Sequence, residues 1–546
     1  MNTKHIFRII FIFFIFTLLS LIAGVTLFHL QIRQHHFFID LAQRQYTFKI
    51  VSSPERGIIY DKNNALLSSN REGIAAFIIP HTLQQPTEVL SFLSEHFPKA
   101  AARYEKNKDS YFCYIKRGLS EYEEQLIKNS NLSDIQLLKE PRRIYHVPES
   151  LTITGITNRD NEGLFGLEWL YNKDLTGIPS EYTLEKDAHS HYFSSTKKEL
   201  SEGTVATSLH TTLDAQLQRI AQEELTKKAL EYNAQEGGLL IMNPHTGEIL
   251  AAATYPHFEL DALTELDMRT TKNNCFTQCY EFGSVCKAFT ALAALEEKVV
   301  TPDEVIDCHN TKLAYFKKRK ITTIIPQGKV TFEEVIQHSN NIGIAKVAFR
   351  LQDRLYHYLK KLGFEQKTGL DFPGQQYGFI NPPSKWSAHS IISLSYGYEI
   401  SATLLQIVRA FAVFANNGRL VTPHIIKQET CPFYPQVASD QTIEAMRTIL
   451  QKTSNKGTGR YGNIPGYTVL AKTGTANFLV NGKYDPDKKI YCFVVIIERG
   501  EYKRVIGCYL KDTSHKRSYA STIVAPLCRT VMEKMIIHEH QIISSF

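Results

Sequence analysis

The longest apolar run of the chain lies near its start, from Ile9 to Phe28, and contains no charged residue. A helix of about 20 apolar residues is long enough to span a bilayer. Lys4 and Arg8 precede the run, and positive residues in that position favour a cytoplasmic N-terminus. We therefore predict a cytoplasmic tail over 1–8 and an uncleaved anchor over 9–28, with everything after it outside the cytoplasm. A cleaved signal peptide is the alternative, but the run is long for a signal and lacks a clear small-residue cleavage site.

Farther along, short apolar segments separated by turn residues predict β-hairpins, at residues 56–67, 238–253 and 490–510. Apolar residues at helical spacing predict a helix after Asp214, whose side chain can cap it, and a last helix over Ala525–Ile537. Strands at both ends of a helix-rich stretch indicate an α+β domain with an antiparallel sheet.

Composition narrows the function only slightly. The net charge is +7, and the Lys and Arg residues are spread along the chain, so a nucleic-acid partner is not expected. The nine cysteines are odd in number and form no metal-ligand spacing. We therefore expect neither a metal nor a cofactor, and the disulfide state stays open.

A candidate nucleophile and base stand at the head of an Ala- and Leu-rich segment that predicts a buried helix. Gly283 allows a sharp turn, and Ser284 then lies at the helix entrance, where free N–H groups can stabilise an oxyanion. Lys287 is three residues on, so its amine can reach the Ser284 hydroxyl. Burial and a neighbouring cation would lower the lysine pKa from ~10.4 toward ~7–8, where the amine can act as a base.

Two further motifs follow in order, Ser339-Asn340-Asn341 and Lys472-Thr473-Gly474-Thr475. Lys472 ends an apolar run that predicts a strand. Similar letters occur elsewhere in polar or turn-rich contexts, at Ser194/Lys197, Ser195/Lys198, Ser68-Ser69-Asn70 and Lys367-Thr368-Gly369. The three candidates are therefore selected by the predicted helix or strand beside each motif, and not by the residue pattern alone.

The three motifs in this order resemble those of the penicillin-recognising serine transferases. The chain as a whole resembles a class B penicillin-binding protein, although residues 80–140 match poorly. The residues outside the motifs that support the resemblance are Arg56-Gly57, Gly166-Leu167-Glu168, Thr212-Leu213-Asp214, Pro244 to Glu248 and Asn274. The resemblance implies an α+β fold with a transmembrane helix, an elongated non-catalytic pedestal over 29–204, and a transpeptidase domain over 205–546. That domain is expected to contain an antiparallel five-stranded sheet flanked by helices.

The resemblance also implies a reaction, acyl transfer on cell-wall stem peptides that end in D-alanyl-D-alanine. Ser284 would attack the penultimate carbonyl and Lys287 would take its proton. Ser339 would pass a proton to the leaving D-alanine, and Asn341 would hold the donor amide and Lys287. The remaining implied roles are a lowered Lys287 pKa owing to Lys472, an oxyanion hole from the N–H groups of Ser284 and Thr475, and substrate binding by Thr473, Gly474 and Thr475.

Within class B, several segments favour a division-type enzyme over an elongation-type one: Met268-Arg269, Ser395-Tyr396-Gly397-Tyr398, Gln406 and Ala415-Asn416-Asn417-Gly418. The expected partners are β-lactams, the membrane, a polytopic glycan polymerase and division proteins. A β-lactam sensor, a non-catalytic scaffold of the same fold and a β-lactamase are the alternatives.

Four residues depart from the usual pattern of the family, Phe282, Glu399, Leu404 and Cys286. The first three put the shape of the cleft in doubt. Cys286 lies about 200° around the helix from Ser284, at about 100° per residue, so we expect its thiol to face the interior.

Overall fold

The computed structural model describes residues 3–52, 54–110, 112–186, 192–260, 268–316, 318–429, 432–513 and 518–544. Its contacts divide the chain into two compact units. The first unit contains Met1–Glu55 and Thr176–Thr207, and the second contains Arg56–Leu175 and Ser208–Phe546. The predicted boundary between a pedestal and a transpeptidase domain, at residues 204 and 205, is a different division and stays a prediction.

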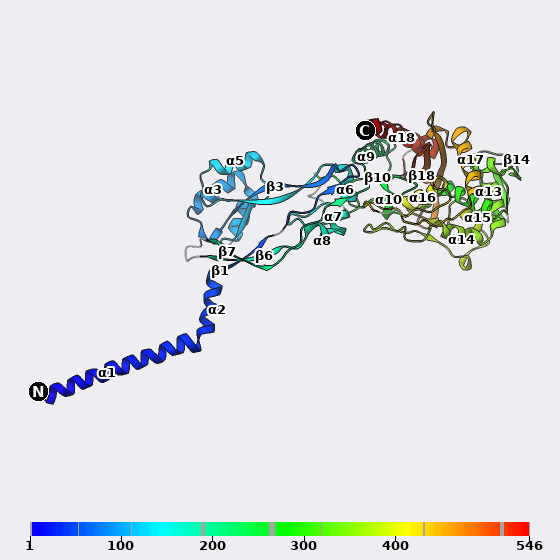
Figure 1. Ribbon diagram of the computed structural model, residues 1–546. Helices are drawn as coiled ribbons and strands as arrows, with labels where there is room; N and C mark the ends of the chain where they lie inside the picture. Colours follow the sequence, from blue (N-terminus) through cyan, green and yellow to red (C-terminus); the bar gives the residue numbers. More distant parts are fainter. Residues whose placement is uncertain are drawn as a thin grey trace. The chain divides into compact units, whose positions relative to one another are not determined.

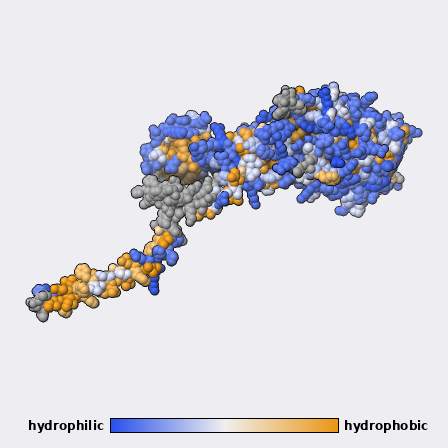
Figure 2. All heavy atoms as spheres, in the orientation of Figure 1, coloured by the Kyte–Doolittle hydropathy of each residue, from blue (hydrophilic) through white to orange (hydrophobic). Residues whose placement is uncertain are grey.

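The first unit begins with the apolar helix α1, Thr3–Phe28, which continues through a π-helical turn, His29–Arg33, into α2, His35–Tyr46. Figure 2 shows apolar side chains along the outside of this helix. Within the described residues, His5–Arg33 is the one stretch long and apolar enough to cross a membrane, and an 18-residue window of it has a mean hydropathy of 2.7. A three-stranded antiparallel sheet completes the unit, in the order β1 (Thr47–Ser52), β6 (Ser180–Lys186), β7 (Tyr192–Ser201).

The second unit begins with a small sheet built around one long strand. The predicted hairpin at 56–67 is confirmed, because β2 (Ile59–Tyr60) pairs antiparallel with β3 (Leu66–Ile78). The other strands are β4 (Cys113–Lys116) and β5 (Gln136–Tyr145), both paired with β3, and β8 (Leu209–His210), paired parallel with β2. Three helices share a local core with β3 and β4: α3 (Pro86–His96), α4 (Pro98–Lys106) and α5 (Glu121–Asn129).

A buried ionic cluster joins Arg56, which precedes β2, to Arg143 of β5 and to Glu168. The two carboxylate oxygens of Glu168 accept from Arg56 Nε and Arg143 Nε, each at 2.7 Å. All three side chains are at most 2% exposed. Because removing one partner leaves an uncompensated buried charge, such a cluster tolerates substitution poorly. Arg56 and Glu168 therefore have a structural role.

The core of the second unit is the five-stranded antiparallel sheet that was predicted, which confirms the α+β class (Figure 1). Its order is β10 (Ile249–Tyr255), β9 (Glu236–Met242), β19 (Tyr502–Lys511), β18 (Lys483–Arg499), β17 (Thr468–Val480). The hairpins expected at 238–253 and 490–510 are its neighbouring pairs β9–β10 and β18–β19. The strand that contains Lys472, β17, is the edge strand of the sheet.

Helices cover both faces of this sheet. One face packs against α9 (Ala215–Glu231) and α18 (Ala520–Ser544), and α18 begins five residues before the predicted Ala525. The other face packs against α11 (Lys287–Glu296) and α16 (Leu404–Ala412). The further helices on this side are α12 (Phe332–Gln337), α13 (Asn341–Leu351), α14 (Arg354–Lys361), α15 (Ser390–Ser395) and α17 (Asp440–Lys456).

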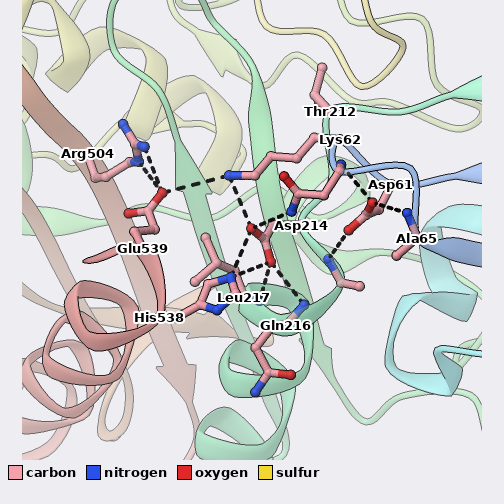
Figure 3. A network of polar contacts seen from close by, with 12 residues as sticks. Asp61, Lys62, Ala65, Thr212, Asp214, Gln216, Leu217, Arg504, His538 and Glu539 are labelled. Carbon is pink, nitrogen blue, oxygen red and sulfur yellow. Dashed lines mark hydrogen bonds and ion pairs between the residues drawn. The ribbon is translucent and has the colours of Figure 1, made fainter. Parts of the chain in front are cut away.

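A polar network joins the turn of the first hairpin to the start of α9 and to α18 (Figure 3). Asp214 caps α9 as predicted, accepting from two backbone N–H groups, and it also contacts Lys62 Nζ and His538 Nε2, each at 3.1 Å. Glu539 of α18 pairs with Arg504 of β19 at 2.7 Å. Although burial raises the pKa of Asp214, the Lys62 ammonium, the backbone N–H of Leu217 and His538 together lower it.

Candidate active site

The nucleophile candidate lies on a tight turn rather than on the α-helix itself. Ser284 belongs to a 3₁₀ turn, Gly283–Cys286, and α11 begins at Lys287. Gly283 has a φ of 59°, in the left-handed region that favours glycine. A Cβ on Gly283 would lie 2.9 Å from the carbonyl oxygen of Thr475, so the turn packs tightly against β17.

The same packing fixes the glycine of the third motif. A Cβ on Gly474 would lie 2.2 Å from the carbonyl oxygen of Phe282 and 2.8 Å from Cγ2 of Val285. No side chain fits at this point without moving the turn. Gly474 therefore acts through the position of the Ser284 turn, which the sequence motif alone did not reveal.

Two buried lysines meet at one serine hydroxyl. Ser339 Oγ is 3.1 Å from Lys287 Nζ and 3.0 Å from Lys472 Nζ. The carbonyl of Ser339 also accepts from Lys287 Nζ at 2.6 Å. The structure thus brings together three of the predicted catalytic residues, Lys287, Ser339 and Lys472. The Lys287 amine was expected to contact the Ser284 hydroxyl, but it donates to Ser339 instead.

The surroundings of both lysines favour the neutral amine. Neither side chain is exposed to solvent. Burial lowers the pKa of Lys287 well below its ordinary value, and the neighbouring Lys472 lowers it further. Burial alone lowers the pKa of Lys472 to about 7. A neutral lysine at this position can take a proton from a serine hydroxyl, which is the role expected of Lys287.

The second motif differs in part from the expectation. Asn341 was expected to hold Lys287, but its side-chain amide donates to the carbonyl of Thr322 at 2.7 Å. Asn340 is buried and caps α13, accepting from two backbone N–H groups. Ser339, with a φ of 57°, instead presents both its carbonyl and its hydroxyl to Lys287. The left-handed backbone at Ser339 explains why the motif's spacing alone did not predict this contact.

The open edge of β17 presents backbone N–H groups that could contribute to an oxyanion hole. The Asn477 N–H donates to the hydroxyl of Tyr398 at 3.1 Å and so points away from β18. Because backbone groups alternate along a strand, the N–H of Thr475 faces the same open edge. That direction suits its expected role in an oxyanion hole with the N–H of Ser284.

The hydroxyls of the third motif have distinct partners. Thr473 Oγ1 donates to Thr458 Oγ1 at 2.9 Å. Thr475 Oγ1 accepts from the backbone N–H of Ala520, the first residue of α18, at 3.3 Å. Since that bond uses an acceptor position of the Thr475 oxygen, the hydroxyl proton is free to point toward an anionic ligand.

The departures from the family pattern lie mainly in the core. Phe282 is buried, with its ring 5.8 Å from that of Tyr509, and Leu404 is fully buried at the start of α16. Glu399 adopts a φ of 59°, and its N–H donates to the carboxylate of Glu281 at 2.7 Å. These contacts show how Phe282 and Leu404 are accommodated by packing.

Cys286 faces the interior, as its position on the helix predicted. Its side chain is 2% exposed, and burial raises the pKa of the thiol to about 12. Eight cysteines are free in the described part of the chain, and Cys431 lies outside it.

The motif look-alikes belong to other elements of the fold than the three candidate motifs. Ser68 to Asn70 belong to β3, and Ser194 to Lys198 belong to β7 of the other compact unit. Lys367 to Gly369 lie between α14 and the short strand Phe379–Ile380. None of these segments belongs to the five-stranded sheet or to α11.

Comparison with known proteins identifies the family. Residues 237–533, more than half of the chain, match the family model described as "Penicillin binding protein transpeptidase domain". The chain belongs to this family. More narrowly, it is a class B penicillin-binding protein, a serine acyl transferase.

Relatives and solved structures agree with this assignment. The protein is 26% identical to stage V sporulation protein D of Bacillus subtilis over 96% of this chain and 84% of the relative. It is 25% identical to peptidoglycan D,D-transpeptidase FtsI of Escherichia coli over 79% of this chain and 73% of the relative. Penicillin-binding protein 3 of Mycobacterium tuberculosis has the same fold, with a TM-score of 0.69 at 22% identity, covering 90% of this chain and 97% of that structure.

Proposed function

We propose that this class B penicillin-binding protein crosslinks peptidoglycan stem peptides through an acyl-enzyme on Ser284, during septal cell-wall synthesis. The observation that supports the chemistry best is the Ser339 hydroxyl held between the amines of Lys287 and Lys472. Both lysines are buried, and the burial favours proton transfer. The Ser284 turn packs against β17 and continues directly into α11, which begins at Lys287, so the nucleophile and the base are held next to the binding strand.

The reaction follows from these contacts. Ser284 Oγ attacks the carbonyl of the penultimate D-alanine while Lys287 Nζ accepts its proton. The N–H groups of Ser284 and Thr475 stabilise the oxyanion. The proton passes through the Ser339 hydroxyl to the amine of the departing D-alanine. An amine of a second stem peptide then attacks the ester, returns its proton by the same path and restores Ser284.

The donor peptide lies along the open edge of β17. Its terminal carboxylate accepts from the hydroxyl of Thr475 and from that of Thr473, which gives up its bond to Thr458, and it lies in the positive potential of Lys472. Asn341 contacts the donor amide with the groups that its bond to Thr322 leaves available. A β-lactam presents a carbonyl and a carboxylate to the same groups, so it acylates Ser284 as well.

A division role rests on sequence features, with the elongation type as its rival within class B. The FtsI relative and the segments at Met268-Arg269, Ser395–Tyr398 and Ala415–Gly418 favour division. Depleting the protein in its host cell tests this assignment. Filaments without septa are expected, and rounded cells would favour the elongation type.

Three rival functions share the fold and can be separated by one experiment. A fluorescent penicillin is added to the purified full-length protein, and both the labelling and the release of the label are followed. A persistent adduct that a peptide donor prevents, with transfer of that donor to an amine, supports a transpeptidase. An unlabelled protein would indicate a scaffold, rapid release a β-lactamase, and an adduct without peptide transfer a sensor.

The proposed location is the cytoplasmic membrane, with residues 9–28 of α1 as a single uncleaved span and the catalytic part on the outer side. Lys4 and Arg8 before the span support this orientation. A polytopic glycan polymerase and division proteins are the proposed partners, by analogy with the family. N-terminal sequencing of the mature protein tests the anchor, and a start after residue 20 would contradict it.

A further inference from the structure

One segment of the chain carries a local concentration of positive charge, although Lys and Arg are otherwise spread along the sequence. The segment from residue 308 to residue 329 contains no Asp or Glu. Its basic residues are Lys312, Lys317, Lys318, Arg319, Lys320 and Lys329. Six positive charges in one segment nearly equal the net charge of +7 of the whole chain. The aromatic pair Tyr315-Phe316 lies within the same stretch.

This segment forms a two-stranded sheet with one buried and one open face. The strands β12 (Leu313–Phe316) and β13 (Arg319–Thr322) pair antiparallel, with Tyr315 opposite Lys320. Ala314 and Ile321 are buried on the inner face, where the ring of Phe316 packs against Phe349 of α13. The hairpin is therefore fixed to the body of the domain.

The open face combines apolar surface with unpaired cations. Tyr315 is 69% exposed. Lys312, Lys318 and Lys320 are exposed, and none of them forms an ion pair with the described residues. Ile324 and Ile325, just after β13, are exposed as well. We name this open face, made of Lys312, Tyr315, Lys318, Lys320 and Ile324, the basic hairpin face.

The base of the hairpin is bonded to the active-site segments. The carbonyl of Thr322 accepts from Asn341, and the Gln327 side chain accepts from Asn340 at 3.0 Å. Arg319 donates to the carbonyl of His389 at 3.0 Å, just before α15. A molecule bound to the basic hairpin face therefore lies beside the segment that positions Lys287.

We propose that the basic hairpin face binds the carboxylates of the acceptor stem peptide, the second substrate of the reaction. This inference rests on the proposed function. The donor's terminal carboxylate is already met on β17 by Thr473 and Thr475, whereas the acceptor arrives with a terminal carboxylate of its own. The unpaired lysines of a hairpin bonded to Asn340 and Asn341 complement that charge, and the exposed apolar groups suit the peptide's small side chains.

The test compares a double variant of the face, Lys318→Gln with Lys320→Gln, with a matched control, Lys227→Gln with Lys298→Gln. The control lysines are also exposed, and Lys298 shares the positive φ of Lys318. Each protein receives a peptide donor and an amine acceptor that ends either in a carboxylate or in a carboxamide. The ratio of transfer to hydrolysis is measured, together with acylation by a penicillin.

We expect the face variant to lose about tenfold in transfer to the carboxylate acceptor, the size of two exposed ion pairs. Transfer to the carboxamide acceptor and penicillin acylation should stay within twofold of native, as should every value for the control. An equal loss with both acceptors, or no loss, would overturn the proposal.

A binding measurement separates this inference from the proposed function. A labelled acceptor peptide with a free carboxylate is titrated into the Ser284→Ala variant, with and without the two lysine changes. We expect the lysine changes to raise Kd about tenfold at low salt, an effect that added salt removes. Unchanged peptide affinity combined with lost binding to phosphatidylglycerol vesicles would assign the face to lipid and contradict the proposal.

Discussion

Replacing Gly474 by alanine tests how far the position of the nucleophile depends on one missing methyl group. The new Cβ would lie 2.2 Å from the carbonyl oxygen of Phe282, whereas real Cβ contacts essentially never fall below 3.0 Å. The Ser284 turn or β17 must therefore shift by at least about 0.8 Å, the difference between these distances. A misplacement of about 1 Å costs on the order of 10²-fold in rate.

The Gly474→Ala variant should therefore fold and yet react slowly. Overpacking of this kind costs about 1–3 kcal/mol of stability, which a thermal unfolding curve would register as a moderate fall in Tm. The second-order rate constant for acylation by a fluorescent penicillin should fall about 100-fold. Gly328→Ala is the matched control, since its Cβ would meet nothing closer than 3.9 Å. If Gly474→Ala is acylated within threefold of the native rate, the Ser284 turn adapts to the added methyl group, and Gly474 does not fix the position of the nucleophile.

Three further predictions follow from the buried groups. Acylation should show a bell-shaped pH profile, rising as Lys287 loses its proton and falling above about pH 7 as Lys472 loses the positive charge; a rate that still rises at pH 10 would contradict these roles. Cys286→Thr should keep acylation within a few-fold, and iodoacetamide should leave Cys286 of the native protein unmodified, because the thiol is buried. Asp214→Asn should keep the helix cap, since Asn caps as well as Asp, but it should lower the free energy of unfolding at neutral pH because Lys62 and His538 lose their anionic partner. Because the folded pKa of Asp214 is lowered, this difference should shrink as pH falls below about 4, and a difference independent of pH would exclude the charge as its cause.

The sequence was sufficient for the elements that depend on local pattern. The hairpins β9–β10 and β18–β19, the Asp214 cap and the inward direction of Cys286 all follow from periodicity over a few residues. The order of the three motifs, together with the family resemblance, was enough to predict that Lys287, Ser339 and Lys472 belong to one catalytic site.

Contacts that depend on distant backbone could not be predicted in the same way. The Ser339 carbonyl reaches Lys287 because residue 339 adopts a left-handed conformation, which a serine shows rarely. The bond from Asn341 to Thr322 depends on a hairpin that local propensity describes poorly. The basic hairpin face was visible in the letters as Lys317 to Lys320, but averaging charge along the whole chain concealed it.

The most direct test of the central claim is the mass of the penicillin adduct on the native protein and on Ser284→Ala. Losing the nucleophile of a cooperative catalytic set can cost on the order of 10⁶ in rate. We therefore expect the native protein to gain one drug mass on the peptide that contains Ser284, and the folded variant to gain none. An adduct on the variant, at Ser194 or Ser195 for example, would contradict the site described above.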